Sequence, residues 1–222
     1  MKRINIAIDG PVASGKSTIA KRLAQKLGYV HIDTGAMYRC VAYVALKNNI
    51  PLNDEKQLTI LANTTPIRLT NDNRVFCDNI DVTHAIRSNE VSTAASQVSV
   101  FSGVRKALVK QQQAMAKESG IVMDGRDIGT VVLADADLKI FQTASVASRA
   151  NRRFQENKSK DIHTSFEQLV KEINDRDYQD THRKESPLKQ ADDAIVIDTS
   201  NLNIDEVIKR IEEEIEKVMT CD

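Results

Sequence analysis

One segment, residues 10–17, constrains this chain more than any other. It reads Gly-Pro-Val-Ala-Ser-Gly-Lys-Ser and matches the pattern G-x-x-x-x-G-K-[ST] in full. The alternating isoleucines of residues 4–8 predict a strand before it. Apolar residues at helical spacing predict a helix after it, which ends at Gly28. A glycine-rich turn between a strand and a helix is the setting in which this pattern binds phosphate.

Each part of this loop has a chemical task. Its N–H groups, at the positive end of the following helix, would surround the β-phosphate. Lys16 would reach the β- and γ-phosphates, and the Ser17 hydroxyl would ligate Mg²⁺. The residues expected to contact ATP are Gly10, Pro11, Val12, Ala13, Ser14, Gly15, Lys16, Ser17 and Thr18.

The loop alone does not name the second substrate. A GTPase would carry Asn-Lys-x-Asp, and the nearest string, Lys-Gln-Ala-Asp at 189–192, lacks the asparagine. Asp124 follows the apolar run 121–123 and could hold Mg²⁺ directly or through water. A turn residue at the end of a strand is an equally good interpretation of Asp124.

Strand and helix patterns alternate along most of the chain. Further strands are expected at 29–32, 121–123, 138–141 and 194–197, and helices at 36–47, from Ser102 to Gly120, and from about Ser145. Thr164 to Glu167 forms a capping box before another helix, and Asn203 with Glu206 marks the start of the last. This alternation predicts an α/β fold with a doubly wound, five-stranded parallel sheet.

Residues 65–82 break the rhythm. Short strands are expected at 67–69, 75–77 and 80–82, with a polar turn at 71–73. We expect a small antiparallel insertion here.

Composition narrows the class of protein. Lysine plus arginine and aspartate plus glutamate number 31 each, and this balance argues against a general binder of nucleic acid or anionic membranes. No apolar run approaches a membrane span, and the N-terminus is too short and polar for a signal peptide. Cys40, Cys77 and Cys221 are odd in number and far apart, which favours a reduced, cytoplasmic compartment. No exposed apolar stripe demands a partner, so we expect a monomer.

Arginines follow the ends of the predicted strands. Arg39 and Arg126 lie on turns at the carboxyl ends of parallel strands, where ligands bind in such sheets. Arg149 and Arg153 share a helix face, and Arg176, Asp180 and Arg183 have helical spacing. Surface solvation accounts for any one arginine, but transfer of a phosphoryl group between two anions needs such a set of fixed positive charges. A nucleotide acceptor would also need no catalytic base, because its phosphate is already mostly dianionic.

Five stretches resemble the bacterial cytidylate kinases, and the resemblance covers essentially the whole chain. They are Ile-Asp-Gly-Pro-Val-Ala-Ser-Gly-Lys-Ser at 8–17, Asp-Thr-Gly-Ala-Met-Tyr-Arg at 33–39, Ala-Ala-Ser-Gln-Val at 94–98, Asp-Gly-Arg-Asp-Ile-Gly-Thr at 124–130, and the stretch 176–187. The resemblance implies ATP-dependent phosphorylation of CMP and dCMP, with Mg²⁺, in pyrimidine nucleotide metabolism.

The resemblance also implies an architecture. The sheet would be of the P-loop and adenylate-kinase type, with a nucleoside-monophosphate (NMP) binding domain and a mobile helical lid. We expect core at residues 1–62, the antiparallel insertion at 63–84, NMP-binding helices and core at 85–148, the lid at 149–164, and core again at 165–222.

Residue roles follow from the same resemblance. Lys16, Arg126, Arg149, Arg153 and Arg176 would be catalytic, and Arg152 would lie near ATP. The CMP site would comprise Asp33, Tyr38, Arg39, Ser96, Arg105, Arg126, Asp127, Arg176, Asp180 and Arg183.

Within that set, Ser96, Arg105, Asp127 and Arg183 would recognise cytosine. A carboxylate such as Asp127 suits the amino group that uracil lacks, and buried polar groups left unpaired penalise the wrong base. From the residues alone, Ser96 is a plain helix residue and Asp127 a turn partner of Arg126.

Two other functions stay open on the residues alone. One is a small P-loop kinase that acts on UMP, AMP or a non-nucleotide metabolite. The other is a non-catalytic nucleotide-binding or RNA-associated module, which the balanced charge disfavours.

Overall fold

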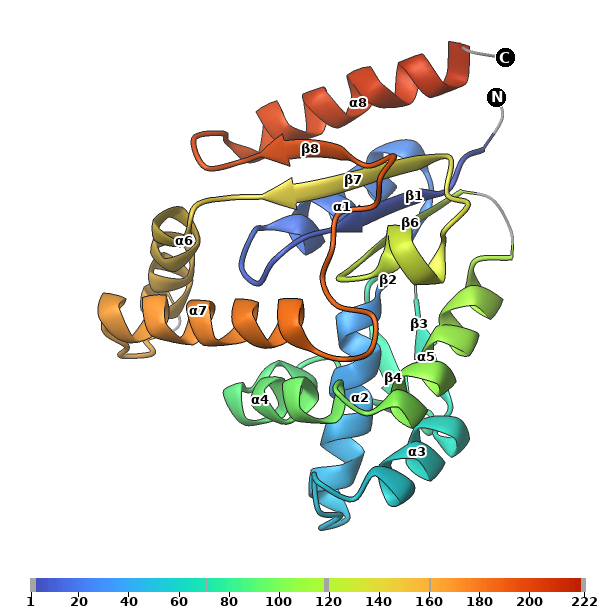
Figure 1. The fold of residues 1–222 in the computed structure, drawn as a ribbon, viewed down its shortest axis with the longest axis vertical. Coiled ribbons are helices and arrows are strands. Elements are labelled where there is room, and N and C mark those ends of the chain that lie inside the picture. Colours follow the sequence, from blue (N-terminus) through green and yellow to red (C-terminus); the bar gives the residue numbers. More distant parts are fainter. Residues whose placement is uncertain (1–2, 71, 118–119, 160, 221–222) are drawn as a thin grey trace. The chain divides into compact units, whose positions relative to one another are not determined.

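The structure is a computed structural model that describes residues 3–70, 72–117, 120–159 and 161–220 (Figure 1). Cys221 and Asn71 of the expected polar turn lie outside the described residues. The chain divides into two compact units, Met1–Tyr29 with Ser119–Asp222, and Val30–Glu118. We call them unit 1 and unit 2 and describe each by itself.

The described residues form a five-stranded sheet in the order β2-β6-β1-β7-β8. Strand β1 pairs in parallel with β6 and β7, and β7 pairs in parallel with β8. The doubly wound α/β class predicted from the alternating pattern is confirmed. The strands are β1 (Ile6–Asp9), β2 (Val30–Asp33), β6 (Ile121–Gly125), β7 (Leu138–Thr143) and β8 (Ile195–Asp198).

Unit 1 has a core built on its central strands. All four residues of β1 are buried, as a strand covered on both faces requires. Helices α1 (Lys16–Leu27) and α8 (Ile204–Thr220) bury apolar stripes against these strands, with Leu23 and Ile211 at 0% exposure. Helices α6 (Val146–Ser159) and α7 (Phe166–His182) pack beside each other through Ala150, Leu169 and Ile173 (Figure 1).

Unit 2 is mainly helical around a separate core. Its helices are α2 (Thr34–Lys47), α3 (Glu55–Thr64), α4 (Asn89–Val98) and α5 (Ser102–Met115), with a 3₁₀ turn η1 (Ala85–Arg87). The predicted antiparallel insertion is present as β3 (Ile67–Leu69), β4 (Val75–Cys77) and β5 (Ile80–Asp81). Cys40 and Cys77 are buried free thiols.

The starts and ends of some helices differ from the sequence-based expectation. Phe101, not Ser102, is the N-cap of α5, and that helix ends at Met115, well before Gly120. The cap of α7 is Ser165, one residue after the expected Thr164, and its hydroxyl accepts the N–H of Gln168. The side chain of Gln168 donates to Glu172 Oε1 at 2.9 Å, so the capping box predicted for Thr164 to Glu167 is replaced by a single cap at Ser165.

Other helix ends follow the prediction. Gly28 ends α1 with a φ of 65°. At the start of α8, Asn203 Oδ1 accepts the N–H of Glu206, and Glu206 Oε2 accepts the N–H of Asn203. This reciprocal pair satisfies two backbone donors at the N-terminus of the helix.

Candidate active site

The P-loop runs from the end of β1 into the first turn of α1. Gly10 is required at its start, since a Cβ there would lie 2.0 Å from the carbonyl oxygen of Gln142. Ala13 adopts a left-handed φ of 58°, which costs a non-glycine residue about 1 kcal/mol. Such strain persists only where the surrounding structure enforces it.

Three side chains hold the loop in its conformation by donating hydrogen bonds to the carbonyl oxygen of Ser14. Gln142 Nε2 donates to it at 2.6 Å, Arg152 Nη1 at 3.0 Å and Thr199 Oγ1 at 3.5 Å. These donors come from β7, α6 and the residue after β8. A loop fixed from three elements can present its N–H groups without reorganising on binding.

Arg149 supports the same loop from α6. Its Nη1 donates to the Val12 carbonyl at 3.0 Å, its Nε to the Ala144 carbonyl at 3.0 Å, and its Nη2 lies 2.6 Å from Asp177 Oδ2. Its guanidinium therefore joins the P-loop to α7. Arg153, by contrast, is partly exposed and lies 3.5 Å from Glu156.

Lys16 is the first residue of α1 and is 5% exposed. Its ammonium donates to the Pro11 carbonyl at 3.1 Å. Burial, together with the positive charge of Arg126, lowers the pKa of Lys16 to about 7. An anionic phosphate beside this ammonium would restore the charged form.

Ser17 and Asp124 meet at the carboxyl ends of β1 and β6. Ser17 Oγ donates to Asp124 Oδ2 at 2.5 Å, and Asp124 is 2% exposed. A hydroxyl and a carboxylate are hard oxygen donors, which suit Mg²⁺. No cluster of three or more His, Cys, Asp or Glu side chains able to hold a metal occurs among the described residues. Mg²⁺ generally keeps several waters and takes further ligands from substrate phosphates.

Arg126 and Asp127 follow β6 and pair with the C-terminal part of α7. Arg126 Nε donates to Asp180 Oδ2 at 2.8 Å, and Arg183 Nη2 lies 3.7 Å from Asp127 Oδ1. Arg183 also lies 3.6 Å from Asp180. Despite burial, the ion pair with Asp180 raises the pKa of Arg126, and Arg126 with its neighbouring arginines lowers that of Asp180.

The spacing of Arg176, Asp180 and Arg183 predicted one helix face. Arg176 and Asp180 lie on α7, which ends at His182, so Arg183 serves as its C-cap. The guanidinium of Arg183 donates to the Ser186 carbonyl from Nε at 2.8 Å. Asp180 thus pairs both with Arg126 of the turn after β6 and with Arg183 at the C-cap of α7.

Five of the predicted CMP-site residues belong to unit 2. Asp33 caps α2 by accepting the N–H of Ala36 at 2.9 Å, and it pairs with Arg39 at 2.8 Å. Arg87 reaches the same carboxylate at 3.1 Å. Burial alone would raise the pKa of Asp33, but Arg39 and Arg87 hold it well below its usual range.

The remaining residues of that set lie on three helices of unit 2. The guanidinium carbon of Arg105 lies 5.4 Å from the centroid of the Tyr38 ring, a cation–π distance. Arg105 Nη1 also donates to the Ser99 carbonyl at 3.1 Å. Ser96 lies on the buried side of α4, four residues after Ser92.

Several residues of these networks escaped the sequence analysis. They are Asp9, Gln142, Asp177 and Arg87, each of which contacts the P-loop, a predicted site residue, or the turn after β6. Of these four residues, only Asp9 could have been noticed in the sequence, since a carboxylate at the end of a buried strand is unusual. The other three act across the tertiary structure, which no local pattern records.

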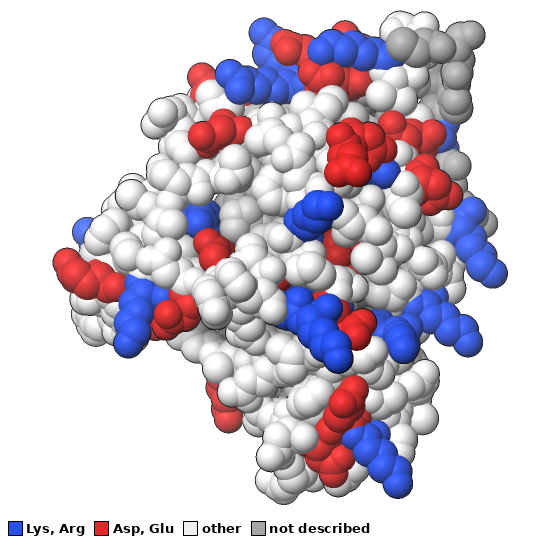
Figure 2. All heavy atoms as spheres, viewed as in Figure 1, with Lys and Arg blue, Asp and Glu red and all other residues white. Residues whose placement is uncertain are grey.

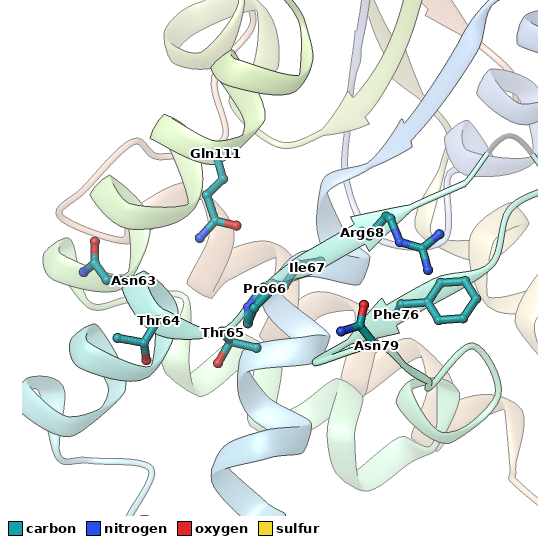
Figure 3. Close-up of a pocket in the computed structure, with 9 residues that line it drawn as sticks. All are labelled: Asn63, Thr64, Thr65, Pro66, Ile67, Arg68, Phe76, Asn79 and Gln111. Atoms are coloured by element: carbon teal, nitrogen blue, oxygen red, sulfur yellow. The ribbon is translucent and has the colours of Figure 1, made fainter.

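A pocket in unit 2 contains none of the predicted site residues (Figure 3). It has a volume of about 440 Å³ and lies along β3, lined by Asn63, Thr64, Thr65, Pro66, Ile67, Arg68, Phe76, Asn79 and Gln111. Arg68 stacks 4.1 Å from the centroid of Phe76, and Gln111 Nε2 donates to the Ala62 carbonyl at 2.8 Å. These polar groups already serve the packing of the insertion, so the pocket adds nothing to the candidate active site.

Charged side chains of both signs are interspersed on the face in Figure 2. Among the helices that the structure describes, none is long and apolar enough to cross a membrane.

Comparison with known proteins gives a family. A family model described as Cytidylate kinase matches residues 6–217. The chain belongs to the cytidylate kinase family. Cytidylate kinases from Streptococcus pneumoniae strains 70585 and Hungary19A-6 are each 52% identical to it over 223 residues, which cover 99% of this chain and 100% of theirs.

Solved structures support the same fold. An uncharacterized protein from Eubacterium ventriosum ATCC 27560 aligns with a TM-score of 0.53 at 13% sequence identity, covering 96% of this chain and 99% of that one. At that identity the likeness concerns the fold alone. The resemblance seen in five sequence motifs thus extends over the full length of this cytidylate kinase family member.

Proposed function

We infer that this chain is a kinase that transfers the γ-phosphoryl group of ATP to CMP and dCMP, giving CDP and dCDP. One observation carries the inference: 52% identity with cytidylate kinases over 99% of the chain. The P-loop, held by hydrogen bonds from other elements, and Arg126 in the turn after β6 agree with it, because transfer between two anions needs fixed donors on both sides.

On the donor side, residues 10–18 would bind the phosphates of ATP. Backbone N–H groups of the loop and of the first turn of α1 would face the phosphate oxygens. The ammonium of Lys16 would bind the β- and γ-phosphates and offset their negative charge. Arg149 and Arg152 would act mainly by holding the loop, since their guanidinium groups already bond to its Val12 and Ser14 carbonyls.

Ser17 and Asp124 would hold Mg²⁺, Ser17 directly and Asp124 directly or through water. When bound, the ion would offset the negative charge of the phosphates. The 2.5 Å bond between Ser17 and Asp124 supports this assignment, because both oxygens already face one point.

On the acceptor side, Tyr38, Arg39 and Arg126 would bind the phosphate of CMP, and Arg176 and Asp180 would contact the sugar. Bidentate guanidinium donors that stay charged suit a dianionic phosphate. During transfer, Lys16, Arg126, Arg153 and Arg176 would stabilise charge on the equatorial oxygens. Ser96, Arg105, Asp127 and Arg183 would distinguish cytosine from uracil.

A panel of acceptors tests this function. ADP release would be measured with ATP and Mg²⁺ against CMP, dCMP, UMP, AMP and shikimate, each at the same concentration. CMP and dCMP should give the highest kcat/KM. A higher kcat/KM for AMP or for shikimate would show that the chain phosphorylates that acceptor instead. ATP binding without acceptor-dependent turnover would show that the chain is a non-catalytic nucleotide-binding module.

We also propose that the chain acts in the cytoplasm as a monomer, within pyrimidine nucleotide metabolism. The free thiols of Cys40 and Cys77 support a reduced compartment. Light scattering after size exclusion would give the oligomeric state.

A further inference from the structure

Asp9 is a buried carboxylate that the phosphate-binding loop does not use. It is the last residue of β1, directly before Gly10, and is 5% exposed. Its Oδ1 accepts the N–H of Ile128 at 2.8 Å, and its Oδ2 accepts the N–H of Gly129 at 2.8 Å. Both carboxylate oxygens are therefore committed to the turn after β6.

These two N–H groups open a single π-helical turn, η2 (Ile128–Val132). The first N–H groups of any helical turn have no acceptor within it and need one from outside. Asp127, the N-cap of η2, makes no side-chain cap hydrogen bond. Asp9 supplies the cap from another strand, and its negative charge suits the positive end of the turn.

The capped turn directly follows two candidate site residues. Arg126, which bonds to Asp180, and Asp127, which pairs with Arg183, immediately precede Ile128. In the sheet, Asp9 lies in register with Gly125. One side chain thus ties the residue that opens the P-loop to the residues that follow Arg126 and Asp127.

We propose that Asp9 is a positioning residue, which fixes the Arg126–Asp127 turn in register with the P-loop and so aligns the acceptor side with the donor side. This inference rests on the proposed kinase function. It assigns Asp9 no contact with either nucleotide. Its effect passes through the backbone of η2 to Arg126 and Asp127.

Burying the Asp9 carboxylate costs free energy of folding, and this cost supports a role for Asp9 other than stabilising the fold. Burial raises the pKa of Asp9 to about 6, although the bonds from Ile128 and Gly129 lower it, Asp127 adds repulsion, and Lys16 adds attraction. A charged group that is expensive to bury is weak evidence for stabilisation. Residues that lower stability while serving activity gather at active sites.

Gly129 lies against the cap without being required for it. A Cβ at this position would lie 3.5 Å from Asp9 Oδ2, an ordinary van der Waals distance, and 3.2 Å from the Cδ of the flexible Lys139 side chain. Lys139 is not the counterion of Asp9, since its ammonium bonds to the Ala134 carbonyl and to Asp193. The cap therefore depends on the Asp9 side chain and on two backbone N–H groups.

The test compares Asp9→Asn with a matched control, Asp137→Asn. Asn keeps one acceptor but turns an amide donor toward the second backbone N–H. Asp137 also accepts a backbone N–H, that of Asn5 at 2.8 Å, but it is exposed and lies near the amino end of β1. Steady-state turnover with CMP, ATP affinity measured without acceptor, and Tm would be recorded for each protein.

We expect kcat of Asp9→Asn to fall at least tenfold and KM for CMP to rise, while ATP affinity stays within about threefold and Tm within a few degrees. Asp137→Asn should keep wild-type kcat. Unchanged kcat in Asp9→Asn would overturn the proposal. Parallel loss of kcat, ATP affinity and Tm would also overturn it, in favour of a role in folding. If the wild type itself failed to use CMP, the proposed kinase function would fail instead.

A second variant keeps the proposal falsifiable if Asp9→Asn does not fold. Asp9→Glu keeps the negative charge but moves the carboxylate by one methylene from the Ile128 and Gly129 N–H groups. Its kcat should fall with ATP affinity retained. Wild-type kcat in Asp9→Glu would overturn the proposal.

Discussion

Single charged side chains in unit 1 owe their states to burial and to their nearest partners. Burial lowers the pKa of Lys16 to about 7, whereas Asp180 keeps Arg126 charged in spite of burial. An anionic phosphate beside Lys16 would raise its pKa again, whereas Asp180 already raises that of Arg126. Two substitutions test the proposed roles of Lys16 and Asp127.

Replacing Lys16 with alanine should abolish most turnover without unfolding the chain. Loss of one donor to the developing charge typically costs two to three orders of magnitude, so we expect a fall of about 10²–10³ in kcat. The fold should persist because, within the part of the chain that the structure describes, the ammonium donates a single hydrogen bond, to the Pro11 carbonyl. Turnover and circular dichroism would be measured with Lys21→Ala, an exposed residue of α1, as the control. Full activity in Lys16→Ala would contradict the P-loop assignment.

Replacing Asp127 with alanine should weaken use of CMP more than use of UMP. A hydrogen bond between a carboxylate and the cytosine amino group is worth about 1.5–3 kcal/mol, which is roughly a tenfold to hundredfold change. The measurement is kcat/KM for both acceptors, with exposed Asp175→Ala as the control. Equal losses for CMP and UMP would remove Asp127 from base recognition.

At the scale of an element, helix α2 depends on the residue before it. Asp33 both caps the helix and pairs with Arg39 and Arg87, so one carboxylate joins the end of β2, helix α2 and the last residue of η1. The same side chain belongs to the predicted CMP site. Its contribution to stability can be separated from its contribution to binding by pH.

Asp33→Ala should lower the free energy of unfolding by about 1–3 kcal/mol, through loss of the cap and of the ion pairs. Asp33→Asn should lose less, since asparagine also caps helices. In the folded chain, Arg39 and Arg87 hold the pKa of Asp33 below the value of about 3.9 that an aspartate has when unfolded. Its stabilisation is therefore present above that pH and lost as the pH falls below it. Urea unfolding at pH 7 and pH 3 should show the deficit of Asp33→Asn shrinking at pH 3, and a constant deficit would contradict this account.

At the scale of the whole molecule, each of the two units has a large hydrophobic core of its own among the described residues. The core of unit 1 gathers around β1, β7, α1 and α8, and that of unit 2 around α2, α4 and α5. Predicted ATP contacts lie in unit 1, whereas the CMP set draws on residues of both units. ATP and CMP should therefore stabilise the folded chain through contacts with different residues.

A non-hydrolysable ATP analogue and CMP should each raise Tm when added alone. At a concentration 100 times Kd, a ligand stabilises the folded state by about 2.7 kcal/mol. Lys16→Ala should lose the shift caused by the ATP analogue and keep the shift caused by CMP, and Arg105→Ala should show the reverse. Thermal denaturation followed by fluorescence would measure both shifts. Loss of both shifts in either variant would contradict separate binding contributions.

Sequence by itself determined the phosphate-binding loop, the alternating α/β fold and the antiparallel insertion. Each depends on residues close together in the chain, where turn geometry and apolar periodicity act directly. The family motifs added the roles of Arg126, Asp127 and Arg176, which remain proposals. Five strands in the order β2-β6-β1-β7-β8 then confirmed the predicted class.

Only the tertiary structure decided how buried polar groups are paired. Arg149 and Arg152 direct guanidinium groups at the Val12 and Ser14 carbonyls, and Asp9 caps a turn 119 residues away. The physical reason is that a buried donor or acceptor must find a partner wherever folding places one. Periodicity records which face of an element is buried, but it does not record which distant backbone group that face will meet.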